Sequence, residues 1–491
     1  MNLTKIEHFS KVSFFENENT SYVRHKMTGH YLDWKNQPGV FKHYPGIDPV
    51  LLPQNVHPPE KMLSALIKGT AVSAPLRAVS IEDISLILRL TCTLTAKARH
   101  AGGDFYYRSV ASAGALYPSE IYVATQSINN LDDGLYHFSI AHHSLSLLRK
   151  GDITAPILTF FLSAIFFRSA WKYRERSYRY HLLDTGHLIE NLTLALKALQ
   201  LCPALSFDFN DSEVNRLLGL DETKEVCLAV CHINGTQAYE DKETEKITEL
   251  QDNIKNASRV AEKETDYPAV HAIHKAGTAV ISQPESKPGM IHELGLAADK
   301  GTRIYPPDPW PETLNYAETV SHRRSKRNFV RQPISQGCLT ALLDGLCSDQ
   351  NQSMRTGFLA GNAEGFDPGI YLLDTSSSLT AMVDSGLFID RMAHICLDQA
   401  WLANAAVHFL FMSNLDFVDS IWGPRGYRYA MMTAGRLGER IYLMATAMGL
   451  GCCGIGAFYD MEAAELLCLN NHSRLLYLVA VGQVKSVKAF A

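Results

Sequence analysis

Several cations next to a hydroxyl form the first candidate binding site in this sequence. The segment is Arg323-Arg-Ser325-Lys-Arg327-Asn-Phe329, and it lies just before a helix predicted over residues 335–346. Arginine guanidinium groups beside a hydroxyl are what binding a phosphate needs. The alternative is a basic patch that is simply solvated.

Two stretches rich in small residues could bring backbone close to a flat ligand. Ser112-Ala-Gly114 has almost no side-chain bulk and adds a hydroxyl, and residues 449–456 contain four glycines. Glycine has no Cβ, so backbone at such positions can approach a ring closely. The alternatives are a tight turn before a strand for the first stretch, and a helix C-cap with its loop for the second.

The first of these stretches resembles a family signature. Residues 108–120 read Arg-Ser-Val-Ala-Ser-Ala-Gly-Ala-Leu-Tyr-Pro-Ser-Glu and run into a predicted strand. This resembles the Arg-x-x-x-Ser-Ala-Gly-x-Leu-Tyr-Pro-x-Glu signature of SagB-type dehydrogenases. These are FMN-dependent azoline oxidases of thiazole and oxazole peptide biosynthesis, a branch of the nitroreductase superfamily. The resemblance implies a flavoprotein oxidoreductase whose cofactor-binding residues include Arg108, Ser112, Ala113 and Gly114.

The second half resembles other parts of the same family's flavin site. Arg323, Ser325 and Arg327 resemble the nitroreductase signature that grips the FMN phosphate and ribityl chain. The glycine-rich stretch resembles the one whose backbone faces the flavin N5 edge, which implies roles for Gly454, Gly456 and Ala457. Lys485 and Lys488 stand where the family often places phosphate-binding basic residues; exposed tail lysines are the equal alternative.

The candidate catalytic residues are Lys172 and Tyr173, which resemble the Lys-Tyr pair that azoline oxidases need. Azoline oxidation removes a carbon-bound proton and transfers a hydride to FMN. The proton needs a base, and a desolvated lysine with a lowered pKa, or a tyrosine beside it, can serve. The alternative is a surface lysine next to a core tyrosine.

An internal repeat indicates which helices and strands position these residues. Arg176-x-Tyr-Arg-Tyr180 matches Arg425-Gly-Tyr-Arg-Tyr429 at an offset of 249, with ten identities through Leu450. A repeat of this length indicates two homologous domains. The order of helices and strands predicts an α+β fold.

We expect an N-terminal arm over residues 1–60, one domain over 61–235, a charged linker over 236–290 and a second domain over 291–491. The resemblance implies two tandem nitroreductase-like domains in an intrachain pseudo-dimer.

The two copies are complementary in their predicted site residues. Carried into the first copy at an offset of 255, the phosphate-binding segment falls on Lys68, Thr70, Val72 and Ala74, so its cations are mostly lost. The second copy has no Ser-Ala-Gly turn, and at the offset of 249 the Lys-Tyr pair becomes Ile-Trp. We therefore expect one intact FMN site per chain.

Composition excludes several other classes. A net charge of −5 gives no basic field for nucleic acid. The longest apolar run, residues 157–167, is too short to span a bilayer and predicts a buried strand. No signal peptide is seen and the ten cysteines lack ligand spacing, so a cytoplasmic protein with reduced thiols and no metal is expected. His271 and His274 could share a helix face, but no third ligand is near.

Three functions remain open on the sequence. The first is an FMN-dependent dehydrogenase of an azoline or a similar C–N or C–C bond in a peptide-derived substrate, with other enzymes of a peptide-modifying complex as candidate partners. The second is an NAD(P)H-dependent nitro or quinone reductase, for which this superfamily needs no dinucleotide fingerprint. The third is an inactive flavin-binding scaffold subunit of a biosynthetic complex.

Overall fold

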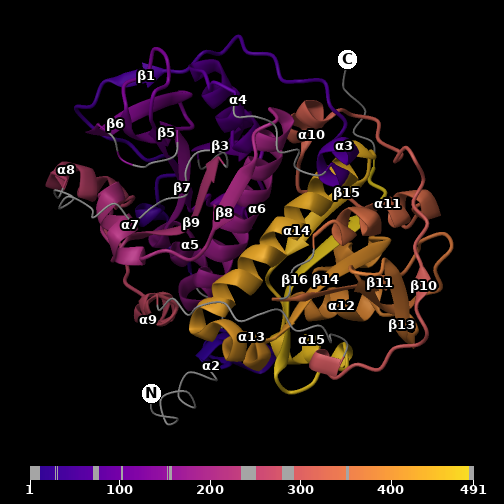
Figure 1. Ribbon diagram of the computed structural model, residues 1–491. Coiled ribbons are helices and arrows are strands. Elements are labelled where there is room, and N and C mark those ends of the chain that lie inside the picture. Colours follow the sequence, from indigo (N-terminus) through magenta and orange to yellow (C-terminus); the bar gives the residue numbers. More distant parts are fainter. Residues whose placement is uncertain are drawn as a thin grey trace. The chain divides into compact units, whose positions relative to one another are not determined.

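The computed structural model describes residues 12–27, 29, 31–69, 77–100, 103–151, 153, 157–233, 250–278, 292–349 and 353–485. The chain divides into two compact units. The first-copy unit comprises His30–Lys61 and Gly69–Val280, and the second-copy unit comprises Met1–Gly29, Met62–Lys68 and Ile281–Ala491 (Figure 1). Thr70, Val72, Ala74 and Lys488 lie outside the described residues.

The first-copy unit is built on a seven-stranded antiparallel sheet in the order β1-β6-β5-β4-β7-β9-β8. Its strands are β1 (Pro49–Leu51), β4 (Ser119–Thr125), β5 (Gly134–Ser139), β6 (Ser144–Lys150), β7 (Leu158–Ile165), β8 (Pro203–Ser206) and β9 (Glu225–Ile233). Its helices are α4 (Ile81–Thr91), α5 (Phe166–Tyr173), α6 (Ser177–Ala198), α7 (Asp211–Leu218), α8 (Asp252–Lys255) and α9 (Pro268–Ala276). Every residue of β7 is buried, which confirms the predicted buried strand as far as Ile165, whereas Phe166 and Phe167 begin helix α5.

The second-copy unit repeats this sheet in the order β10-β13-β12-β11-β14-β16-β15. Its strands are β10 (Thr302–Arg303), β11 (Arg355–Ala360), β12 (Gly369–Asp374), β13 (Leu379–Ser385), β14 (Val407–Asn414), β15 (Gly451–Ile455) and β16 (Ser473–Gly482). Its helices are α2 (Val12–Asn19), α3 (Leu63–Lys68), α10 (Tyr316–His322), α11 (Gln336–Cys347), α12 (Ile389–Ile395), α13 (Leu415–Trp422), α14 (Gly426–Ala447) and α15 (Asp460–Leu466).

The repeat seen in the sequence is a repeat of structure. The paired elements α5 and α13, α6 and α14, and β7 and β14 begin and end at positions 249 apart. The long helices α6 and α14 are buried on nearly all sides, as expected of helices that lie within a core. Figure 1 shows α14 running along β15 and β16. The predicted α+β fold with two tandem copies is confirmed.

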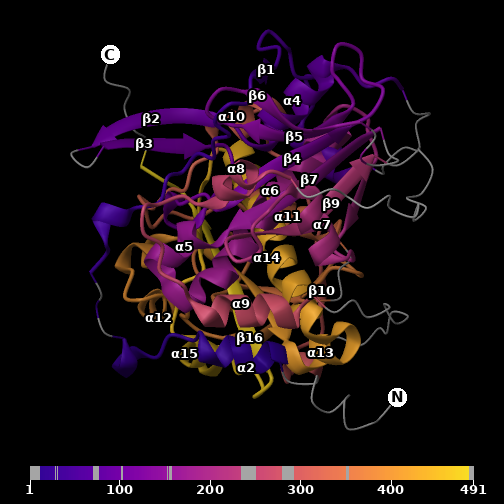
Figure 2. The same cartoon turned by 90° about the vertical axis from the view of Figure 1, so that its left-hand side faces the viewer.

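One hairpin of the first copy has no counterpart among the described residues of the second copy. Strands β2 (Leu94–His100) and β3 (Gly103–Arg108) form a separate two-stranded hairpin in the first-copy unit (Figure 2). Its second strand leads directly into the Ser-Ala-Gly turn. The hairpin therefore belongs to the copy that carries the dehydrogenase-like signature.

The N-terminal arm contributes to both units. Helices α2 and α3 belong to the second-copy unit, whereas residues 31–61 belong to the first-copy unit. Lys42 is buried there beside the Glu225 carboxylate, and its Nζ donates a 2.7 Å hydrogen bond to Tyr122. A buried charge is tolerated when it is paired in this way. The arm is thus part of both cores.

The described part of the charged segment before residue 290 is packed. Ile254 of α8 contacts the core around Tyr122 and Leu218, and Val270 and Ile273 of α9 are buried. Composition assigned residues 250–278 to the linker, because the many charges there conceal a few apolar side chains at helical spacing. The predicted domain boundaries remain predictions. In the described part of the chain, the helices lack the combination of length and apolar character needed to cross a bilayer.

Candidate active site

The Ser-Ala-Gly turn is fixed by a carboxylate from the long helix α6. Ser112 Oγ donates a 2.5 Å hydrogen bond to Asp184, and the Ala113 amide donates one of 3.1 Å to the same carboxylate. Ser112 Oγ in turn accepts the Tyr117 amide at 2.9 Å. Gly114 adopts φ 65° and ψ 10°, a left-handed conformation that glycine takes without strain. Asp184 therefore sets the shape of the turn.

Sequence reasoning missed Asp184. Its side chain is buried, and this burial raises its pKa to about 6, although the hydrogen bonds from Ser112 and Ala113 act in the opposite direction. At the offset of 249 the second copy has Thr433 at this position. The acid occurs only in the copy that has the turn, and this difference was the one available signal.

The turn and the predicted catalytic pair are brought together. Lys172 and Tyr173 end α5 and are both half-buried. A methyl group built on Gly114 would lie 2.8 Å from Tyr173 Oη and 3.2 Å from Lys172 Nζ. Lys172 Nζ is 5.4 Å from the centroid of the Tyr173 ring. The polar ends of both side chains thus face the bare Cα of Gly114.

A buried arginine ties α5 to the same turn. Arg168 Nη1 donates to the Tyr117 carbonyl at 2.9 Å and to the Glu120 carboxylate at 2.6 Å. Glu120 also contacts His137 at 2.8 Å. Burial disfavours the Glu120 charge, but Arg168 and His137 outweigh it and hold the pKa of Glu120 well below its usual range. Glu120, the glutamate of the signature, therefore anchors the helix that ends in Lys172 and Tyr173.

Apolar and backbone contacts complete the support of α5. Leu116 of the turn packs in one cluster with Phe167 and Trp171. Trp171 Nε1 donates to the Asp33 carbonyl at 2.9 Å, so the N-terminal arm also holds this helix. Arg174, directly after Lys172 and Tyr173, has φ 51° and ψ −131°, a conformation that is costly for any residue other than glycine.

Arg108 lies beneath the turn. Its guanidinium stacks over the Tyr117 ring at 4.4 Å and donates a hydrogen bond to the Val40 carbonyl. The side chain is buried, with 2% of its surface exposed. In this conformation Arg108 supports the turn, and its predicted contact with a cofactor remains a prediction.

In the second-copy unit, the predicted phosphate-binding segment, residues 323–329, runs beside the glycine-rich strand β15. The Lys326 amide donates to the Cys452 carbonyl at 2.8 Å, and Ser325 pairs with Cys452 in a parallel bridge. Ser325 Oγ is 2.9 Å from Tyr442 Oη, which also accepts the Gly454 amide at 2.6 Å. Two motifs more than 120 residues apart in the chain therefore form one surface.

The cations of this surface differ in exposure. Arg323 is buried, with its Nε 3.7 Å from Glu439 and its guanidinium 5.4 Å from the Tyr442 ring centroid. Arg327 is exposed and lies 5.8 Å from the Trp401 ring centroid. Lys485 is exposed, and its amide donates to the Asn328 carbonyl at 3.1 Å. The exposed donors, which are Ser325, Arg327 and Lys485, suit a phosphate chemically.

The glycines of β15 are required by the protein's own packing. A methyl group on Gly454 would lie 1.8 Å from Tyr477 Oη, and one on Gly451 would lie 2.0 Å from Val484. The residues that follow the strand, Gly456 and Ala457, are half-buried. Close approach of a ring is therefore not needed to explain Gly454.

This arrangement of fold and motifs agrees with a known family. The chain matches the nitroreductase family over residues 75–235 and 375–483, which together make up more than half of its length. The protein belongs to the nitroreductase family.

Three relatives are similar to the chain over parts of its length. A protein of Methanocaldococcus jannaschii named as a nitroreductase, MJ1384, is 32% identical over 34% of this chain and 90% of its own length. The trifolitoxin-processing protein TfxB of Rhizobium leguminosarum bv. trifolii is 30% identical over 33% of this chain. The microcin B17-processing protein McbC of Escherichia coli is 30% identical over 23% of it. The chain spans about half the length of the last two, which support the SagB-type resemblance.

A solved structure shares the whole fold. The crystal structure of an Anabaena variabilis protein named as a nitroreductase superposes with a TM-score of 0.74 and covers 96% of this chain and 99% of that one. The identity is 24%, so the similarity shows the tandem fold alone.

Proposed function

We propose that this protein is an FMN-dependent oxidoreductase that dehydrogenates an azoline or a similar C–N or C–C bond in a peptide-derived substrate. The observation that carries the proposal is that the side-chain ends of Lys172 and Tyr173 lie next to Gly114 in the Ser-Ala-Gly turn. The Tyr173 hydroxyl and the Lys172 Nζ converge there on a position without a side chain. The names of two relatives, which process trifolitoxin and microcin B17, support a peptide as the substrate.

The second-copy unit offers residues that fit the cofactor. Ser325, Arg327 and Lys485 would hold the phosphate, with Arg323 behind them against Glu439. Gly456 and Ala457 would lie toward the flavin ring. When bound, FMN supplies a hydride acceptor. That the two copies share one such site remains a prediction.

The protein's own part in the reaction is to remove a proton. Lys172 in its neutral form, or Tyr173 as its phenolate, accepts the carbon-bound proton of the substrate. Both side chains are half-buried, and removal from water in general favours the neutral amine of a lysine, the form that accepts a proton. Arg168 and Asp184 hold the helix and the turn in register, and they are positioning residues.

The test is to remove the base while leaving flavin binding intact. Lys172→Ala and Tyr173→Phe should keep a full FMN load and normal reduction by dithionite. Anaerobic flavin reduction by a thiazoline-containing peptide should slow by roughly 100- to 10,000-fold. Trp422→Phe, at the position of Tyr173 in the second copy, is the matched control and should change nothing. Normal reduction by the peptide in both variants would overturn the assignment and favour an NAD(P)H-driven reductase.

A further inference from the structure

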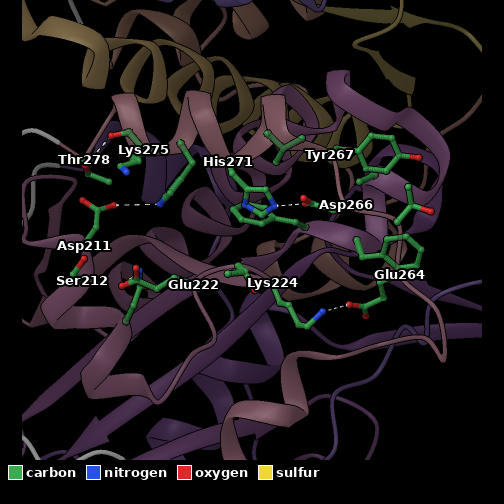
Figure 3. Close-up of a pocket in the computed structure, with 18 residues that line it drawn as sticks. Asp211, Ser212, Glu222, Lys224, Glu264, Asp266, Tyr267, His271, Lys275 and Thr278 are labelled. Carbon is green, nitrogen blue, oxygen red and sulfur yellow. Dashed lines mark hydrogen bonds and ion pairs between the residues drawn. The ribbon is translucent and has the colours of Figure 1, made fainter.

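A cavity of about 600 Å³ lies in the first-copy unit between α5, α7 and α9 (Figure 3). Phe166, Phe167 and Ala170 of α5 form one wall. The Phe166 ring contacts two imidazoles, with centroid distances of 5.2 Å to His271 and 5.9 Å to His274. The catalytic pair lies farther along the same helix and does not line this cavity.

The cavity is acidic. Its wall includes the carboxylates of Asp211, Glu222, Glu264 and Asp266 but only two lysines. Lys224 pairs with Glu264 at 2.6 Å, and His271 contacts Asp266 at 2.7 Å (Figure 3). His274 Nε2 also lies 3.8 Å from Asp211. The four carboxylates still outnumber the two lysines, so the cavity favours a cationic ligand.

The internal repeat shows what covers the corresponding surface of the second-copy unit. The offset of 249 carries Ala170 to Asp419 and Asp211 to Asp460. Both positions are contacted there by the chain's own N-terminal segment. The Ser13 amide donates to Asp419 at 2.8 Å, and the Tyr22 amide donates to Asp460 at 2.9 Å.

That segment is extended at Val23, between helix α2 and a short 3-10 helix over Arg24–Lys26. Tyr22 pairs with Tyr459 in a parallel bridge. Two residues later, Arg24 forms ion pairs with Glu462 at 2.7 Å and with Asp398 at 3.0 Å, and it stacks over Tyr459 at 4.1 Å. Main-chain and arginine contacts thus act together at the start of α15.

The first-copy unit keeps the acidic half of this arrangement. Asp211 and the exposed Glu213 correspond to Asp460 and Glu462. On the other side, His274 of α9 contacts Tyr178 at 3.2 Å, which is the counterpart of the contact of the N-terminal segment with Tyr427. Helix α9 replaces part of that segment, and the space beside Asp211 is the cavity.

We propose that this cavity binds an extended peptide segment that carries an arginine or a lysine. The basic side chain of the peptide lies against the acidic rim at Glu222 and Asp266, which are both exposed. The proposal concerns binding at a second site and does not depend on the proposed oxidation, because none of these residues belongs to the flavin or Lys-Tyr surfaces.

The probe is a fluorescein-labelled peptide with the sequence of residues 20–27, Thr-Ser-Tyr-Val-Arg-His-Lys-Met. Fluorescence anisotropy with the full-length protein should show saturable binding. A second peptide, with glutamate in place of its arginine and lysine, should bind at least tenfold more weakly. Hydrogen exchange should show protection at residues 211–224 and 264–278.

Variants of the exposed rim test the site without disturbing the core. Glu222→Lys combined with Asp266→Lys should weaken the basic peptide by at least tenfold and strengthen the acidic one. Asp132→Lys, at an exposed position outside the cavity, should change neither. Absence of saturable binding, equal affinity for both peptides, or an unchanged affinity in the rim variant would overturn the proposal. Protection confined to residues 459–464 would do so too, because the peptide would then occupy the groove of the N-terminal segment.

Discussion

Ser112 and Asp184, 72 positions apart in the chain, are joined by a 2.5 Å hydrogen bond that closes the Ser-Ala-Gly turn onto α6. The carboxylate is buried, so its ionised form is costly, and burial raises its pKa to about 6 from an ordinary 3.8. This relationship predicts how the stability of the fold depends on pH.

Asp184 should make the protein lose stability as pH rises from about 4 to 6. The folded state keeps the proton up to a pH near 6, whereas the unfolded chain releases it near 3.8, so the stabilisation is complete below 3.8 and is lost as the pH passes through 6. A shift of about two pKa units corresponds to about 3 kcal/mol. Asp184→Asn cannot ionise and should lack this loss when urea unfolding is compared at pH 4 and pH 7.

Comparing the wild type with Asp184→Asn isolates the contribution of Asp184, because all other carboxylates are present in both proteins. Asp132→Asn, which removes an exposed carboxylate, should keep the wild-type pH dependence. Identical pH slopes for wild type and Asp184→Asn would show that the folded state does not hold this proton.

Gly114→Ala should disable the catalytic pair. The new methyl group would lie 2.8 Å from Tyr173 Oη and 3.2 Å from Lys172 Nζ, so both side chains must move. We expect turnover of a thiazoline peptide to fall by about 100-fold, the scale of a lost base. Gly46→Ala is the matched control: it has φ +81° and no atom within 4 Å, so it adds backbone strain without a clash. Equal activities of the two variants would contradict the proposed contact.

Arg327→Ala should weaken FMN binding by about 10- to 100-fold, the scale of one charge-assisted hydrogen bond to phosphate. Arg327 is exposed, so the fold should survive, whereas removing Arg323 would also leave the buried Glu439 without its neighbouring cation. Lys68→Ala is the control, because Lys68 already pairs with Asp344 and should not hold phosphate. FMN fluorescence quenching measures the affinity.

The stoichiometry tests the same assignment. Only the second copy carries the Arg-x-Ser-x-Arg segment, so we expect one FMN per chain from the absorbance of released flavin. Two per chain would contradict the complementary-copies argument.

The sequence predicted those parts of the fold that are local or repeated. The offset of 249 carries α6 onto α14 without a gap because a helix buried on all sides tolerates few insertions. Helix caps are equally local: Ser80 forms a capping box with Asp83, and Ser335 accepts the Cys338 amide. Such signals lie within a few residues of one another.

What the sequence did not show depends on distant contacts. Asp184 looks like any polar residue of a helix until the turn is folded against it. The part of the charged segment around Ile254 packs because a surface is available on the sheet, which composition cannot reveal. The glycine at 454 suggested approach of a ring, but its cause is Tyr477 on the next strand.

Gly454→Ala should destabilise the second-copy unit by more than 2 kcal/mol, because a methyl group 1.8 Å from Tyr477 Oη overpacks two adjacent strands. Gly449→Ala has φ +74° and nothing within 4 Å, so its cost should stay near 1 kcal/mol. Urea unfolding gives both values. In a Tyr477→Ala background the cost of Gly454→Ala should shrink, and an unchanged cost would mean that the strain lies elsewhere.

Arg174→Gly should raise stability and lower activity together. Arg174 holds φ 51° and ψ −131°, and its counterpart in the second copy is Gly423, at φ 58° and ψ −162°. Relief of the backbone strain should stabilise the fold by about 1–3 kcal/mol. Glycine also adds entropy to the unfolded chain, which offsets part of this, so the free energy of unfolding should rise by about 1 kcal/mol. The strain adjoins Tyr173, so the freed backbone should let that side chain move and slow thiazoline oxidation by about tenfold. Gly423→Ala, the reverse change in the second copy, should lower the melting temperature. A lower melting temperature for Arg174→Gly would show that the conformation is not strained.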